Sequence, residues 1–116
     1  MDNFPPITIN GQRSKVLVVD DSVENIEIIE YILADMEYDI YKALNGQEAL
    51  DKIDKVEPDI ILLDVVMPGM SGFEVAKCVK NDTNTRLIPI IMITALDRRE
   101  DRLKGLAAGV DDFITK

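Results

Sequence analysis

The sequence predicts one α/β domain, a doubly wound parallel sheet with helices on both faces. Three runs of consecutive apolar residues are typical of strands that are buried on both sides. Between them lie segments whose apolar residues recur at helical spacing, and such alternation is typical of parallel sheets with right-handed crossovers. The length of 116 residues is that of a single domain.

The first strand and helix are expected directly after the N-terminal segment. The strand is the valine-rich run 16–19, and Ser22 or Asp21 is suited to cap the helix that follows. The inward-facing residues of that helix are expected to be Val23, Ile26, Ile29, Leu33 and Met36. Residues 38–43 form a shorter, more polar strand, as expected at the edge of a sheet.

The middle of the chain repeats the pattern. A second helix starts at Asn45 and Gly46 and ends at Pro58. The apolar strand 59–63 follows, then a loop and a helix over 72–80. Another apolar strand is expected over 88–93, where a proline near its start is tolerated.

The two ends complete the expected organisation. A helix over 98–108 is followed by Gly109, which is suited to a left-handed C-cap, and by a last strand over 112–115. Residues 1–14 lack periodicity and are expected to be a flexible N-terminal extension. The domain that carries the function is then expected over 15–116, truncated after its last strand.

Composition excludes several classes of function. There is no histidine, so Ser-His-Asp and Cys-His catalysis and most zinc sites are excluded. The net charge of −9 disfavours nucleic acids and anionic membranes as partners. The single Cys78 cannot form an internal disulfide, and no signal peptide or long apolar segment is present, so a cytoplasmic location is expected. Any bound metal must use oxygen ligands.

Polar residues follow the strands at the edge where ligands bind in such sheets. They are Asp20 and Asp21, then Asp64, then Thr94, then Lys116. Each has an ordinary structural alternative. Asp21 can be only a helix cap, Asp64 the end of a strand, Thr94 a strand residue and Lys116 a solvated lysine.

Taken together, these residues favour a metal-dependent site. A cap needs one acid, and clustered carboxylates repel one another unless a cation compensates them. Mg²⁺, with Mn²⁺ as an alternative, would be held by Asp21 and Asp64, with Asp20 bonded to its waters. The pattern then indicates phosphoryl transfer to a carboxylate nucleophile, with Lys116 and Thr94 contacting phosphoryl oxygens.

These segments resemble the receiver domains of two-component response regulators. The resemblance covers about 15–116 and is carried by VLVVDDS at 16–22, IILLDVVMPGMSG at 60–72, IPIIMITA at 88–95 and GVDDFITK at 109–116. In combination these motifs are specific, whereas each alone is weak.

The resemblance implies a function and a set of site residues. Asp64 would accept a phosphoryl group from a histidine kinase or phosphotransfer protein. The metal ligands would be Asp20, Asp21, Asp64 and the backbone carbonyl of Val66. Thr94 and Phe113 look like the switch pair, and the domain would be a signalling module rather than an enzyme, promoting only its own phosphorylation and dephosphorylation.

The resemblance also implies a flavodoxin-like strand order, 2-1-3-4-5, and a fifth helix that this sequence lacks after Lys116. Without that helix, an exposed apolar patch is expected, drawn from those that face the uncovered side of the sheet among Ile61, Leu63, Ile91, Ile93 and Ile114. A homodimer or a segment-exchanged dimer would follow from such a patch. Receivers like this one also occur in regulators with cyclic-di-GMP-synthesising output, which is an analogy only.

Three other functions fit parts of the pattern. A haloacid-dehalogenase-type phosphatase would need a second acid two residues after its nucleophile, but Val66 stands there. A flavodoxin-like binding module would need a phosphate loop after the first strand, where Asp20 and Asp21 would repel a flavin phosphate. A pseudo-receiver that serves only as a docking surface would not retain an acyl phosphate on Asp64.

Overall fold

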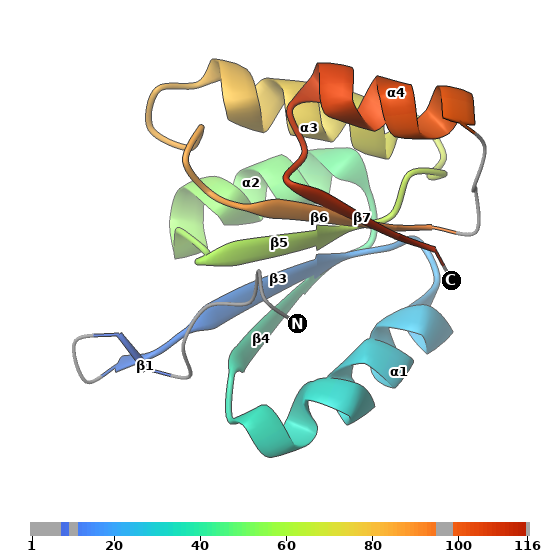
Figure 1. The fold of residues 1–116 in the computed structure, drawn as a ribbon. Coiled ribbons are helices and arrows are strands. Elements are labelled where there is room, and N and C mark those ends of the chain that lie inside the picture. Colours follow the sequence, from blue (N-terminus) through green and yellow to red (C-terminus); the bar gives the residue numbers. More distant parts are fainter. Residues whose placement is uncertain (1–7, 10–11, 95–98, 116) are drawn as a thin grey trace.

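A computed structural model of the chain describes residues 8–9, 12–94 and 99–115 (Figure 1). Its main sheet has five strands in the order β4-β3-β5-β6-β7, and every neighbouring pair is parallel. The strands are β3 (Lys15–Val19), β4 (Asp39–Ala43), β5 (Ile60–Leu63), β6 (Ile90–Thr94) and β7 (Asp112–Thr115). The predicted order 2-1-3-4-5 and the doubly wound fold are confirmed.

Helices cover both faces of this sheet. They are α1 (Val23–Leu33), the 3₁₀ turn η1 (Ala34–Met36), α2 (Gly46–Val56), α3 (Gly72–Asn81) and α4 (Arg99–Ala108). Figure 1 shows α1 on one face, with α2, α3 and α4 on the other. In the described part of the chain, no helix is long and apolar enough to cross a membrane.

Short polar side chains start three of the helices. The side chains of Ser22, Asn45 and Ser71 each accept a hydrogen bond from the backbone N–H three residues later. This arrangement satisfies an N–H group that has no partner inside the helix. Ser22 therefore caps α1, and the alternative in which Asp21 is that cap is wrong.

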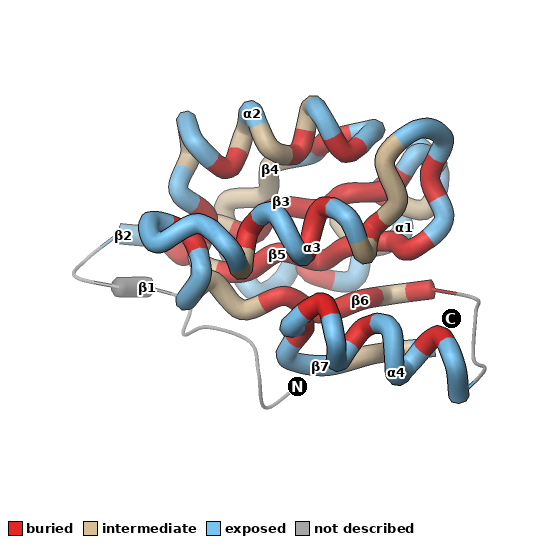
Figure 2. Tube along the Cα trace, turned by 90° about the horizontal axis from the view of Figure 1, so that it is seen from above, coloured by how far each residue is buried: buried red, intermediate tan, exposed pale blue. Residues whose placement is uncertain are grey.

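The core consists of two layers, one on each face of the sheet, and its buried positions concentrate on the inner strands β3, β5 and β6 (Figure 2). The central strand β5 supplies both layers, because successive side chains point to opposite faces. Ile61 and Leu63 lie in the layer under α2 and α3, whereas Ile60 and Leu62 lie in the layer under α1.

This alternation corrects the expected exposed patch. Ile61 and Leu63 are on the opposite face and are buried, and Ile91, on the face of α1, is also buried. Ile93 and Ile114 are half-buried on that face. The continuous apolar runs do not show which residues face which way, and of the five candidates Ile93 and Ile114 are the two that are partly exposed.

Other differences are local. Met36 and Val23 are exposed, because α1 is already packed through Ile26 and Leu33 and the chain turns into η1 after Leu33. β6 starts at Ile90 rather than two residues earlier. Pro89 has no N–H to donate, although its carbonyl accepts a hydrogen bond from Ile61.

The segment expected to be a flexible N-terminal extension contains a short antiparallel ribbon. It is formed by β1 (Thr8–Ile9) and β2 (Gln12–Arg13), which pair directly ahead of β3. Arg13 forms an ion pair with Asp39, the first residue of β4. The ribbon is therefore tied to the edge strand of the main sheet by a contact that the local sequence pattern does not reveal.

Candidate functional site

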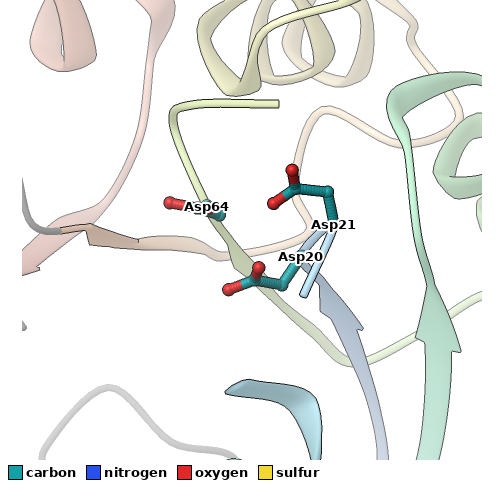
Figure 3. Close-up of side chains that lie close together, drawn as sticks. All are labelled: Asp20, Asp21 and Asp64. Carbon is teal, nitrogen blue, oxygen red and sulfur yellow. The ribbon is translucent and has the colours of Figure 1, made fainter. Parts of the chain in front are cut away.

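Three carboxylates meet where the neighbouring strands β3 and β5 end. The register pairs Val19 with Leu63, so the residues that follow these two strands emerge at the same level. The Asp64 N–H donates to the carbonyl of Val19 over 2.9 Å. Carboxylate oxygens of Asp20, Asp21 and Asp64 all lie within 4.8 Å of one another (Figure 3).

Asp20 is buried and held by the start of α1. Its exposed fraction is 2%. Its Oδ1 accepts a hydrogen bond of 2.9 Å from the Ser22 N–H, and its Oδ2 accepts one of 3.3 Å from the side-chain amide of Asn25. Its own N–H donates to the carbonyl of Ala43 on β4. These contacts orient the carboxylate from two elements at once.

Asp64 is held by the loop that follows it. The side chain is 8% exposed, and its Oδ1 accepts a 2.9 Å hydrogen bond from the N–H of Val65. The carbonyl of Val65 in turn accepts a hydrogen bond from the N–H of Gly72, the first residue of α3. The phosphoacceptor candidate therefore has a defined carboxylate orientation, set by the backbone beside it.

The cluster suits a hard divalent cation. Three like charges this close repel one another, and two of them are buried, where water screens them poorly. Asp21 is exposed and completes the group from the solvent side. An all-oxygen donor set of carboxylates is what Mg²⁺ or Mn²⁺ prefers, so the residues present fit such an ion.

The other predicted site residues lie around this edge or outside the described residues. Thr94 is the last residue of β6, beside β5, and is 1% exposed. Val66, two residues after Asp64, is 59% exposed. Lys116 and Leu96 lie outside the described residues.

Phe113 lies on β7, which neighbours β6, and is half-buried. The Arg102 guanidinium of α4 is 5.8 Å from the centre of its ring. On the same side, the ring packs over Gly105 of α4. A cavity of about 250 Å³ lies beside it, lined also by Leu106 and Val110. The aromatic candidate for the switch pair is thus in contact with α4.

Comparison with known proteins decides the family. Residues 16–116 match the family model described as the response regulator receiver domain. The chain belongs to this family. The match covers the main sheet from the second residue of β3 onward and the three clustered carboxylates of this receiver domain.

Individual relatives agree with this assignment. The receiver domain is 48% identical over 103 residues to the response regulator PleD of Caulobacter vibrioides; the match covers 89% of this chain and 23% of PleD. The chain thus spans less than a quarter of that relative. The structure of the chemotaxis protein CheY4 of Vibrio cholerae is 37% identical, with a TM-score of 0.84 and coverage of 89% of this chain and 86% of that one. A putative response regulator from Chloroflexus aurantiacus is 34% identical, with the same TM-score and coverage of 89% and 84%.

Two groups that orient the carboxylates of this receiver domain were not predicted from the sequence. Asn25 was not singled out, although its position one turn into α1 places its amide near Asp20. The N–H of Val65 is a backbone group, which no sequence motif displays. An asparagine four residues after the second of two acids is the one signal that was available.

Proposed function

We propose that this receiver domain is a phosphoacceptor in which Asp64 takes a phosphoryl group from a histidine kinase or phosphotransfer protein in a reaction that depends on Mg²⁺. The observation that carries the proposal is the group of three carboxylates within 4.8 Å at the ends of β3 and β5. Asp64 is suited to the nucleophile's part because it is buried and its Oδ1 is held by the Val65 N–H.

The transfer makes one bond and breaks one. A carboxylate oxygen of Asp64 attacks phosphorus, the P–N bond to the donor imidazole breaks, and its electron pair returns to the imidazole nitrogen. Asp21, Asp64 and the backbone carbonyl of Val66 would hold the ion, with Asp20 bonded to its waters. Bound Mg²⁺ supplies charge neutralisation for the phosphoryl oxygens. Lys116 and the Thr94 hydroxyl would bind two of those oxygens.

Thr94 and Phe113 are proposed to transmit the change. The Thr94 hydroxyl would move toward the phosphoryl group, and the Phe113 ring would turn inward from its position against α4. Support comes from their places on neighbouring strands and from the contacts of the ring with Gly105 and Arg102. The surface formed by α4 and β7 would change as a result, and a partner or an output domain would bind this changed surface.

The proposal includes a setting for this module. It is a cytoplasmic signalling domain that promotes only its own phosphorylation and dephosphorylation, without direct contact to nucleic acid or membrane. The net charge of −9 supports the last point. The second candidate is a pseudo-receiver. Such a domain has the same fold and serves only as a docking surface for a partner, without forming an acyl phosphate on Asp64.

Acetyl phosphate tests the proposed function directly. With Mg²⁺, the chain is expected to gain one phosphoryl group by intact mass, and hydroxylamine should remove it, because an acyl phosphate is cleaved by that nucleophile. With excess EDTA the gain should fall strongly. A chain that stays unmodified in Mg²⁺ would instead favour the pseudo-receiver.

The phosphoryl state is expected to be long-lived. Val66 is exposed two residues after Asp64, and its apolar side chain has no group that could orient an attacking water. Val66→Asn, alone or with Leu96→Glu, should shorten the lifetime of the adduct several-fold in a chase without phosphodonor. Val66→Leu is the matched apolar control and should decay like the native chain. Equal decay of the Asn and Leu variants would contradict the assignment of Val66.

A further inference from the structure

The loop from Asp64 to α3 ends close to the residues where it begins. The first residue of α3, Gly72, donates its N–H to the carbonyl of Val65 over 2.8 Å. Its α-carbon is so close to the phosphoacceptor that a Cβ there would lie 2.1 Å from the carbonyl oxygen of Asp64. It would also lie 2.9 Å from the Val65 Cα. No side chain fits between the start of α3 and the Asp64–Val65 peptide.

This glycine is not required by the backbone conformation. The glycines with positive φ among the described residues are Gly69 and Gly109, and Gly72 is not one of them. Alanine would also be the better residue inside a helix. The close approach to Asp64 is therefore the physical reason for glycine at this position.

The start of α3 is itself firmly placed. Ser71 caps the helix by accepting a hydrogen bond from the N–H of Glu74, and Val75 and Ala76 are buried in the core against the sheet. The backbone at Gly72 thus forms a fixed surface behind the Asp64–Val65 peptide. That peptide carries the N–H that donates to Asp64 Oδ1.

We propose that Gly72 is a positioning residue for Asp64: its lack of a side chain lets the start of α3 hold the Asp64–Val65 peptide and so orient the nucleophilic carboxylate. The inference rests on the proposed function. A second close approach lies at the same end of the loop, two residues before Gly72. A Cβ on Gly46, the first residue of α2, would lie 2.8 Å from the Cβ of Met70.

Gly72→Ala tests the proposal, with Gly69→Asn as the matched control. Gly69 is in the same loop, but a Cβ there meets nothing within 4 Å, and asparagine adopts a positive φ at less cost than most other residues. At saturating Mg²⁺, Gly72→Ala should lower the rate of labelling by acetyl phosphate by roughly tenfold to a hundredfold, since small displacements of a reacting group have effects of this size. The control should stay within about twofold of the native rate.

Two further readouts separate positioning from a general loss of stability. The affinity for Mg²⁺ should change less than the rate, because Asp20 and Asp21 follow β3 and do not belong to the shifted segment. The NMR signal of the Val65 amide should move and its exchange with solvent should accelerate in Gly72→Ala. A folded variant with a native rate and a native Val65 amide overturns the proposal.

If Gly72→Ala does not fold, hydrogen exchange of the native chain decides the question. Val65 and Gly72 amides as protected as those of Val75 and Ala76 support the proposal, and exchange as fast as that of Gly69 overturns it. The native chain also separates the two claims. If it takes no phosphoryl group, the proposed function fails, while the amide measurements still test whether Gly72 holds the peptide.

Discussion

Asp64→Asn is expected to abolish phosphoryl uptake from acetyl phosphate, with a fall in rate of more than roughly a thousandfold. Asparagine keeps the shape of the buried side chain, and its amide oxygen can still accept the hydrogen bond from the Val65 N–H. It lacks the anionic oxygen that attacks phosphorus. The measurement is intact mass after incubation with Mg²⁺ and the donor.

Asp54→Asn is the matched control for this variant. Asp54 is exposed on α2, in the half of the helix that leads away from the three clustered carboxylates. The control should label like the native chain. An adduct of normal yield on Asp64→Asn would place the acceptor on another residue and contradict the assignment of Asp64.

Asp21→Asn is expected to have opposite effects on stability without and with Mg²⁺. Without the ion, removing one of three neighbouring carboxylates relieves repulsion, so the melting temperature should rise. With Mg²⁺ at about ten times its dissociation constant, the native chain should gain about 1.4 kcal/mol, or about 5 °C in Tm, and the variant should gain much less. Labelling of the variant should fall strongly as well.

Glu27→Gln removes one exposed carboxylate from α1 outside the cluster and serves as the charge control. It should keep the native response to Mg²⁺ in a thermal melt. If Asp21→Asn were stabilised by Mg²⁺ as much as the native chain, the ion would be bound without Asp21, and the proposed ligand set would be wrong.

The overall fold and the location of the site could be predicted from the sequence for a simple physical reason. Strands buried on both faces are continuous apolar runs, as in β3 and β5, and each of these runs ends at an aspartate. Parallel strands place their carboxyl ends at one edge, so Asp20, Asp21 and Asp64 had to be neighbours once the sheet was predicted. The starts of α2 and α3, expected at Asn45–Gly46 and Gly72, were similarly local, because an N-cap and its partner are three residues apart.

Only the tertiary structure decided how these carboxylates are held. A continuous apolar run has no period-two signal, so the faces of Ile60 and Ile61 followed from the packing of α1 and α3 against the sheet. Ser22, and not Asp21, caps α1, and the Asp21 carboxylate lies with those of Asp20 and Asp64. The approach of Gly72 to the Asp64 carbonyl depends on where α3 packs, which no local pattern specifies. The sequence by itself thus determined that Asp20, Asp21 and Asp64 lie together, and the packing of helices on the sheet determined their orientation.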